Sequence, residues 1–158
     1  MKPTKLWSLA SYAFASAIFA FVLAEILVTR GFSVPLSPIN LPIAIASVAV
    51  ALGVLAIPMA RYRKALKDPK KPAKRLAPTY AFRVVVLAKA SALSATLFFG
   101  WHIGILVAQL TLPAITANIV YTIVGIATSV ITVVVALVVE NLFKIPPDIE
   151  EPTEGAAA

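Results

Sequence analysis

The sequence contains no cysteine and only one histidine among its 158 residues, and 13% of the residues are charged. Without cysteine there is no disulfide, no thiolate metal site and no thiol nucleophile. A lone histidine, with no carboxylate at its own depth, leaves too few ligands for a metal and no carboxylate to orient the histidine as the base of a nucleophile. We therefore expect no metal site, no cofactor and no enzymatic activity.

Apolar residues are abundant instead, at 60% of the chain, and the mean hydropathy is +0.92. Four apolar segments lie at about 6–28, 41–59, 84–110 and 119–140. Each is close to the ~20 residues that an α-helix needs to cross ~30 Å of hydrocarbon. The sequence predicts an all-α integral membrane bundle of four transmembrane helices within residues 1–145, with no soluble domain.

The net charge of +7 is distributed unevenly. Eight of the fourteen lysines and arginines lie in the segment 61–78 between the second and third helices. The positive-inside rule then places this loop and both termini in the cytoplasm. Topogenic charge explains the cluster, and contact with anionic lipid headgroups follows for Arg61, Arg63, Lys64 and Lys67. Nucleic-acid binding is not expected, because no aromatic interleaving or recognisable fold accompanies the charge.

The third segment carries a face of small and polar residues. At about 100° per residue, Thr96, Gly100 and Gly104 fall on the same side as Lys89. The spacing of Gly100 and Gly104 lets two helix backbones approach closely in lipid. This face should point at protein, and a second stripe containing His102 lies roughly opposite it. The third helix is therefore expected to be the central one.

A matching stripe runs along the fourth segment. Counting back from Glu140, its small and polar members share one side of the helix, namely Ala136, Thr132, Ser129, Gly125, Thr122 and Asn118. We predict that this stripe faces the small-residue stripe of the third helix. Because Lys89 and Glu140 then lie at similar depths, we also predict an ion pair between them.

Each polar group in the membrane has two interpretations. Lys89 either fixes helix register with Glu140 or contacts an anionic headgroup or solute. His102, two turns from Gln109, either makes a hydrogen bond across helices or acts as a proton relay. Glu25, near the outer end of the first helix, is either an interfacial anchor or a functional carboxylate.

The last residues, 146–158, begin with two prolines and are rich in acidic residues. Prolines at this position stop a helix. The composition of the segment predicts a disordered cytoplasmic tail.

The segment Leu87-Ala88-Lys89-Ala90-Ser91-Ala92-Leu93, followed by Gly100, and the closing Lys144-Ile145-Pro146-Pro147 after Glu140 resemble the actinobacterial domain of unknown function 3180 family. The resemblance extends over nearly the whole chain. It implies a small four-helix protein of the bacterial plasma (inner) membrane, often encoded beside folate-biosynthesis genes. It implies no mechanism.

Two classes of function are left open. The first is a non-catalytic accessory or scaffold protein that packs with partner membrane proteins or with its own copies. The second is an oligomeric transporter of a small solute or ion that uses Lys89, His102 and Glu25, since four helices alone enclose little cavity. Transport predicts water around these groups, whereas the accessory role predicts that they are paired and dry.

Overall fold

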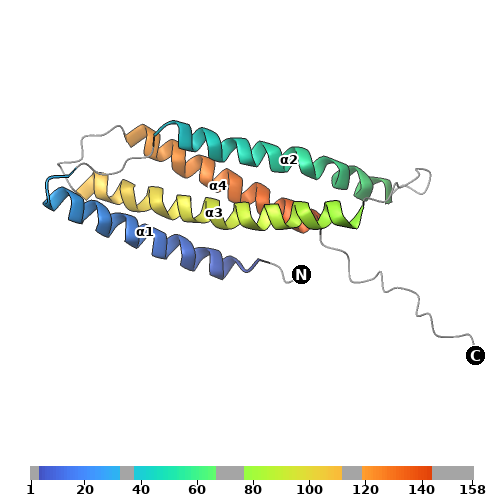
Figure 1. The fold of residues 1–158 in the computed structure, drawn as a ribbon, viewed down its shortest axis with the longest axis horizontal. Coiled ribbons are helices and arrows are strands. Elements are labelled where there is room, and N and C mark those ends of the chain that lie inside the picture. The colour runs from blue at the N-terminus through green and yellow to red at the C-terminus, as the bar shows by residue number, and fades with distance from the viewer. Residues whose placement is uncertain (1–3, 33–37, 67–76, 112–118, 144–158) are drawn as a thin grey trace, which may run out of the picture.

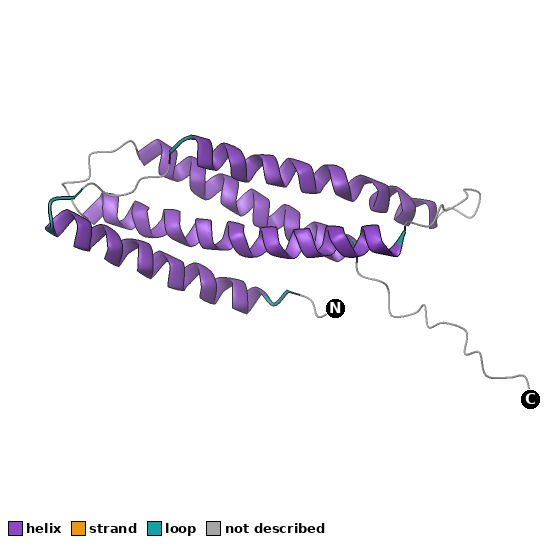
Figure 2. Cartoon of the chain, viewed as in Figure 1, coloured by secondary structure: helices purple, strands orange, loops and turns teal. Residues whose placement is uncertain are grey.

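The computed structural model describes residues 4–32, 38–66, 77–111 and 119–143. Within these ranges all regular secondary structure is helical (Figure 2). The helices are α1 (Leu6–Thr29), α2 (Asn40–Leu66), α3 (Pro78–Thr111) and α4 (Ile119–Leu142). All four are long and apolar enough to cross a membrane, which confirms the predicted architecture. The predicted tail at 146–158 lies outside the described residues.

Two helices are longer than their apolar segments. The predicted loop 61–78 starts too early, because Arg61, Arg63 and Lys64 continue α2 beyond Pro58. Hydropathy marks only the apolar part of a helix, whereas arginine and lysine favour helices and their charge stabilises a helix C-terminus. At the other side of the connection α3 begins at Pro78, a residue type suited to the first turn of a helix. Lys67 lies outside the described residues.

The four helices follow the spatial order α1, α3, α4, α2 (Figure 1). Helix α3 packs along α1 on one side and along α4 on the other, while α2 packs mainly on α4 and touches α3 lightly. Over the described residues α1 makes no close backbone contact with α2 or α4. The prediction that the third helix is central and packs on the fourth is confirmed.

Two buried clusters hold this arrangement together. One joins α2, α3 and α4, and its largest fully buried side chain is Leu52. The other joins α1 and α3 through Ala20, Ala24, Ile105 and Ala108. Alanine dominates both clusters, as expected where helices in lipid associate through close backbone approach rather than through a hydrophobic driving force.

Hydroxyl groups also connect neighbouring helices. Each of three side chains donates a hydrogen bond to a backbone carbonyl oxygen of the next helix, at donor–acceptor distances of 2.7 to 3.1 Å. Such bonds contribute about 0.6 kcal/mol each on average in membrane proteins. They run from Ser16 to Leu97, from Tyr80 to Leu55 and from Thr132 to Ile45. The Thr132 hydroxyl is shared with the carbonyl oxygen of Thr128 in its own helix, at 2.8 Å.

Candidate functional site

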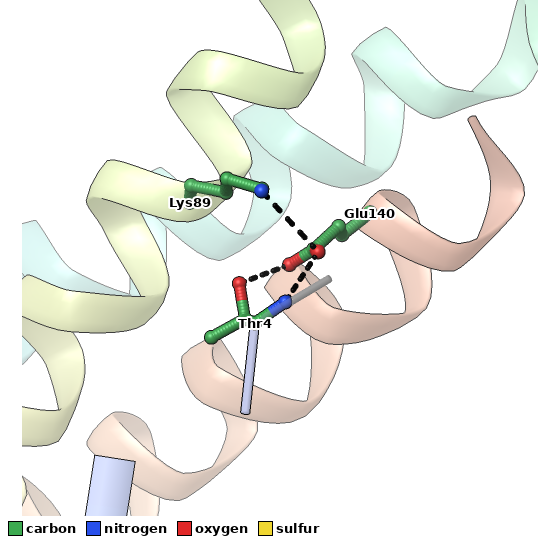
Figure 3. Close-up of polar contacts among 3 residues, drawn as sticks. All are labelled: Thr4, Lys89 and Glu140. Atoms are coloured by element: carbon green, nitrogen blue, oxygen red, sulfur yellow. Dashed lines mark hydrogen bonds and ion pairs between the residues drawn. The ribbon is translucent and has the colours of Figure 1, made fainter. Parts of the chain in front are cut away.

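The ion pair expected from the sequence is present where α3 and α4 meet (Figure 3). Lys89 Nζ lies 3.7 Å from Glu140 Oε1. The Glu140 side chain is 6% exposed and that of Lys89 is 27% exposed. The carboxylate is thus held inside the protein, while the lysine side chain reaches its surface.

Thr4 is a further partner of Glu140. Its backbone N–H donates to Glu140 Oε1 at 2.8 Å, and its hydroxyl donates to Glu140 Oε2. Thr4 immediately precedes the N-cap of α1, so this carboxylate ties the start of α1 to α4 although the two helices do not pack together. We call the end of the molecule where Thr4, Lys89 and Glu140 meet the terminal end.

Sequence reasoning missed Thr4 because it lies before the first helix and outside any periodic pattern. One signal could have prompted a search for it. A buried carboxylate accepts several hydrogen bonds, and one lysine cannot satisfy them all.

The glycines of α3 do not face α4. A Cβ atom added to Gly100 would lie 2.1 Å from the carbonyl oxygen of Ala13, and one added to Gly104 would lie 2.2 Å from that of Ala17. For Gly100 and Gly104 the predicted packing against α4 is therefore wrong, because both rest on the alanine face of α1. Lys89, on the same stripe, does meet α4. Thr96, on the same stripe, is buried, and its hydroxyl bonds to the carbonyl oxygen of Ala92 within α3.

The α4 stripe faces α3 through His102 instead. His102 is 1% exposed, and its imidazole occupies the space beside Gly125, where an added Cβ would lie 2.2 Å from Nε2. Nδ1 lies 2.6 Å from the carbonyl oxygen of Phe98, which assigns the proton to Nδ1. Nε2 is then an acceptor, and it has no hydrogen-bond partner in the described part of the chain.

Replacing Gly125 by alanine is expected to lower the free energy of unfolding by about 2 kcal/mol, because the new methyl group overlaps the imidazole. Combining it with His102→Ala should cost less than the sum of the two single substitutions, since the smaller side chain makes room. Titration of the purified single and double variants with a denaturing detergent measures their free energies of unfolding. Strictly additive costs would contradict the contact.

Three further polar side chains of the helices are Gln109, Ser129 and Glu25. The side-chain amide of Gln109 and the hydroxyl of Ser129 are buried without a hydrogen-bond partner among the described residues. Glu25 is exposed on α1. No group of three His, Cys, Asp or Glu residues that could hold a metal ion occurs in the described ranges.

Two apolar clefts open between the helices. One, of about 270 Å³, lies between α2 and α3, and Thr132 of α4 also lines it. The other, of about 200 Å³, lies between α1 and α4, and Thr96 of α3 also lines it. Neither is lined by Lys89, His102 or Glu25.

Four membrane-crossing helices joined through buried small residues define a multi-pass α-helical membrane protein. Over residues 9–147, which include nearly all of the four helices, the sequence matches the family described as Protein of unknown function (DUF3180), and the chain belongs to that family. The resemblance noted from the sequence is thereby confirmed. No curated protein and no solved structure matches the chain.

Proposed function

We propose that the protein is a non-catalytic accessory or scaffold protein of the bacterial plasma membrane, with both termini in the cytoplasm. One observation carries this proposal: the charged groups inside the structure are engaged with one another rather than arranged around a cavity. Glu140 is bound by Lys89 and Thr4, and the lining of neither cleft contains a charged residue. Groups that bind a transported ion would be expected to face such a cavity.

The surfaces open to a partner are the outer faces of the helices. Gly100, Gly104 and Gly125 are used within the chain, so partners would contact the outer faces of the helices. These faces carry many large apolar side chains, for example Phe14 and Phe19 on α1 and Ile43 on α2. A second membrane protein, or a second copy of this chain, would bind there.

The orientation rests on charge. Arg61 and Lys64 are exposed near the end of α2, in line with the basic segment that follows. These side chains and that of Arg63 would contact anionic headgroups of the cytoplasmic leaflet, each contributing about 1 kcal/mol near the surface.

The experiment is extraction of the tagged protein in a mild detergent at native expression, followed by determination of the mass of the complex and identification of co-purifying proteins. A stoichiometric partner protein, or a stable assembly of copies without transport activity, is the expected result. A monomer without a partner would contradict the proposal.

A transporter is the second candidate, favoured by the buried unpartnered atoms of His102, Gln109 and Ser129. Flux of protons or small ions into liposomes that contain the purified protein tests it. A flux that His102→Leu abolishes and Glu25→Gln leaves intact would establish transport through the α3–α4 interface. The accessory role predicts no flux above that of empty liposomes.

A further inference from the structure

The cleft between α1 and α4 exists because α1 packs on α3 alone. Its walls are apolar side chains of α1 and α4, and its floor is α3. The residues that define it include Leu6 and Ala10 on α1, Thr96 and Phe99 on α3, and Val130 and Val134 on α4. The result is an apolar slot of about 200 Å³ that opens at the protein surface.

The slot leads to the polar cluster at the terminal end. Leu6 is the first residue of α1 and follows closely on Thr4, which is bonded to Glu140. Lys89 lies seven residues before Thr96 on α3, hence on the same face and about 10 Å nearer the terminal end. An apolar slot that ends in a cluster of charged and hydrogen-bonding groups has the shape of an amphiphile binding site.

Charge at this end favours an anionic headgroup. The described part of α1 and α3 carries Lys5, Arg83 and Lys89 at this end against Glu140 of α4, and Arg61, Arg63 and Lys64 stand at the neighbouring end of α2, so positive charge is in excess. The Glu140 carboxylate already accepts two hydrogen bonds from Thr4. The first turn of α1 contains no acidic residue, and its N-cap makes no side-chain hydrogen bond, so the positive end of the helix dipole adds to the attraction.

We propose that the α1–α4 cleft binds one acyl chain of an anionic phospholipid, with the lipid phosphate beside Lys5 and Lys89. Lipid tails are as apolar as the cleft wall, so burial of the chain alone gives little preference over the bulk bilayer. Selectivity therefore comes from the headgroup. A cationic side chain at a membrane surface favours an anionic lipid by about fivefold.

The test uses the full chain, delipidated in a mild detergent. Phosphatidylglycerol or phosphatidylcholine with the same acyl chains is added, and bound lipid is counted by native mass spectrometry. We expect one tightly retained phosphatidylglycerol per chain, in preference to phosphatidylcholine. Lys5→Gln, which changes an exposed residue outside the helix contacts, should lower this preference about fivefold.

Two matched variants locate the site. Ala10→Trp fills the α1–α4 cleft and should abolish retention, whereas Val48→Trp fills the α2–α3 cleft and should leave it intact. Circular dichroism verifies that both variants are folded. Equal retention of the two lipids, or equal effects of the two tryptophans, would overturn the proposal. Neither result bears on the accessory role, which depends on protein partners.

Discussion

The Gly100→Ala variant is expected to lose about 3 kcal/mol of unfolding free energy, at the upper end of the range for overpacking. The new Cβ would lie 2.1 Å from the carbonyl oxygen of Ala13 and 2.9 Å from Ser16 Cβ. A backbone oxygen cannot rotate aside as a side chain does, so α1 must move away from α3. That movement also strains the 2.7 Å hydrogen bond from Ser16 to the carbonyl oxygen of Leu97. Titration with a denaturing detergent measures the loss.

Gly53→Ala is the matched control. Gly53 is also inside a transmembrane helix, but an added Cβ there meets no atom within 4 Å. Alanine has the higher helix propensity, so this substitution should be neutral or stabilise the protein by up to about 1 kcal/mol. If Gly100→Ala and Gly53→Ala behaved alike, the close approach of α1 to α3 would be disproved.

The glycine pair illustrates what periodicity can establish. The spacing of Gly100 and Gly104 correctly indicated a close helix contact. Periodicity assigns residues to a face of a helix, but it does not say which of two suitable neighbours covers that face. The structure pairs the glycines with α1, and His102 on the second stripe of α3 with Gly125 of α4.

The contact between His102 and Gly125 could not be predicted from the sequence, for a related reason. The imidazole of His102 fills the space that Gly125 leaves, so the two residues fit only as a pair. Nothing in either helix alone reveals the relative rotation that brings them together. The contact of Thr4 could not be predicted, because residues outside a helix follow no helical periodicity. The basic end of α2 was not predicted as helical, because hydropathy falls where the charged residues begin.

The Lys89–Glu140 pair could be predicted from the sequence, because the depth of a residue in the bilayer follows from its position along the helix. Replacing Lys89 by methionine is expected to lower the free energy of unfolding by about 3 kcal/mol. The substitution removes the ammonium group that lies beside the nearly buried carboxylate of Glu140, and breaking such a pair costs at least that much in protein interiors.

The pair also predicts the effect of Glu140→Gln on the free energy of unfolding. This effect should change sign when Lys89 is replaced by methionine. In the otherwise unchanged protein it should destabilise by about 2 to 3 kcal/mol, because the lysine loses its counter-charge. In the Lys89→Met background it should stabilise by about 1 kcal/mol, since it removes a buried charge that has lost the lysine, while the amide oxygen still accepts the Thr4 N–H. The four proteins form a double-mutant cycle in denaturing detergent. Additive costs would mean that the two charges are uncoupled.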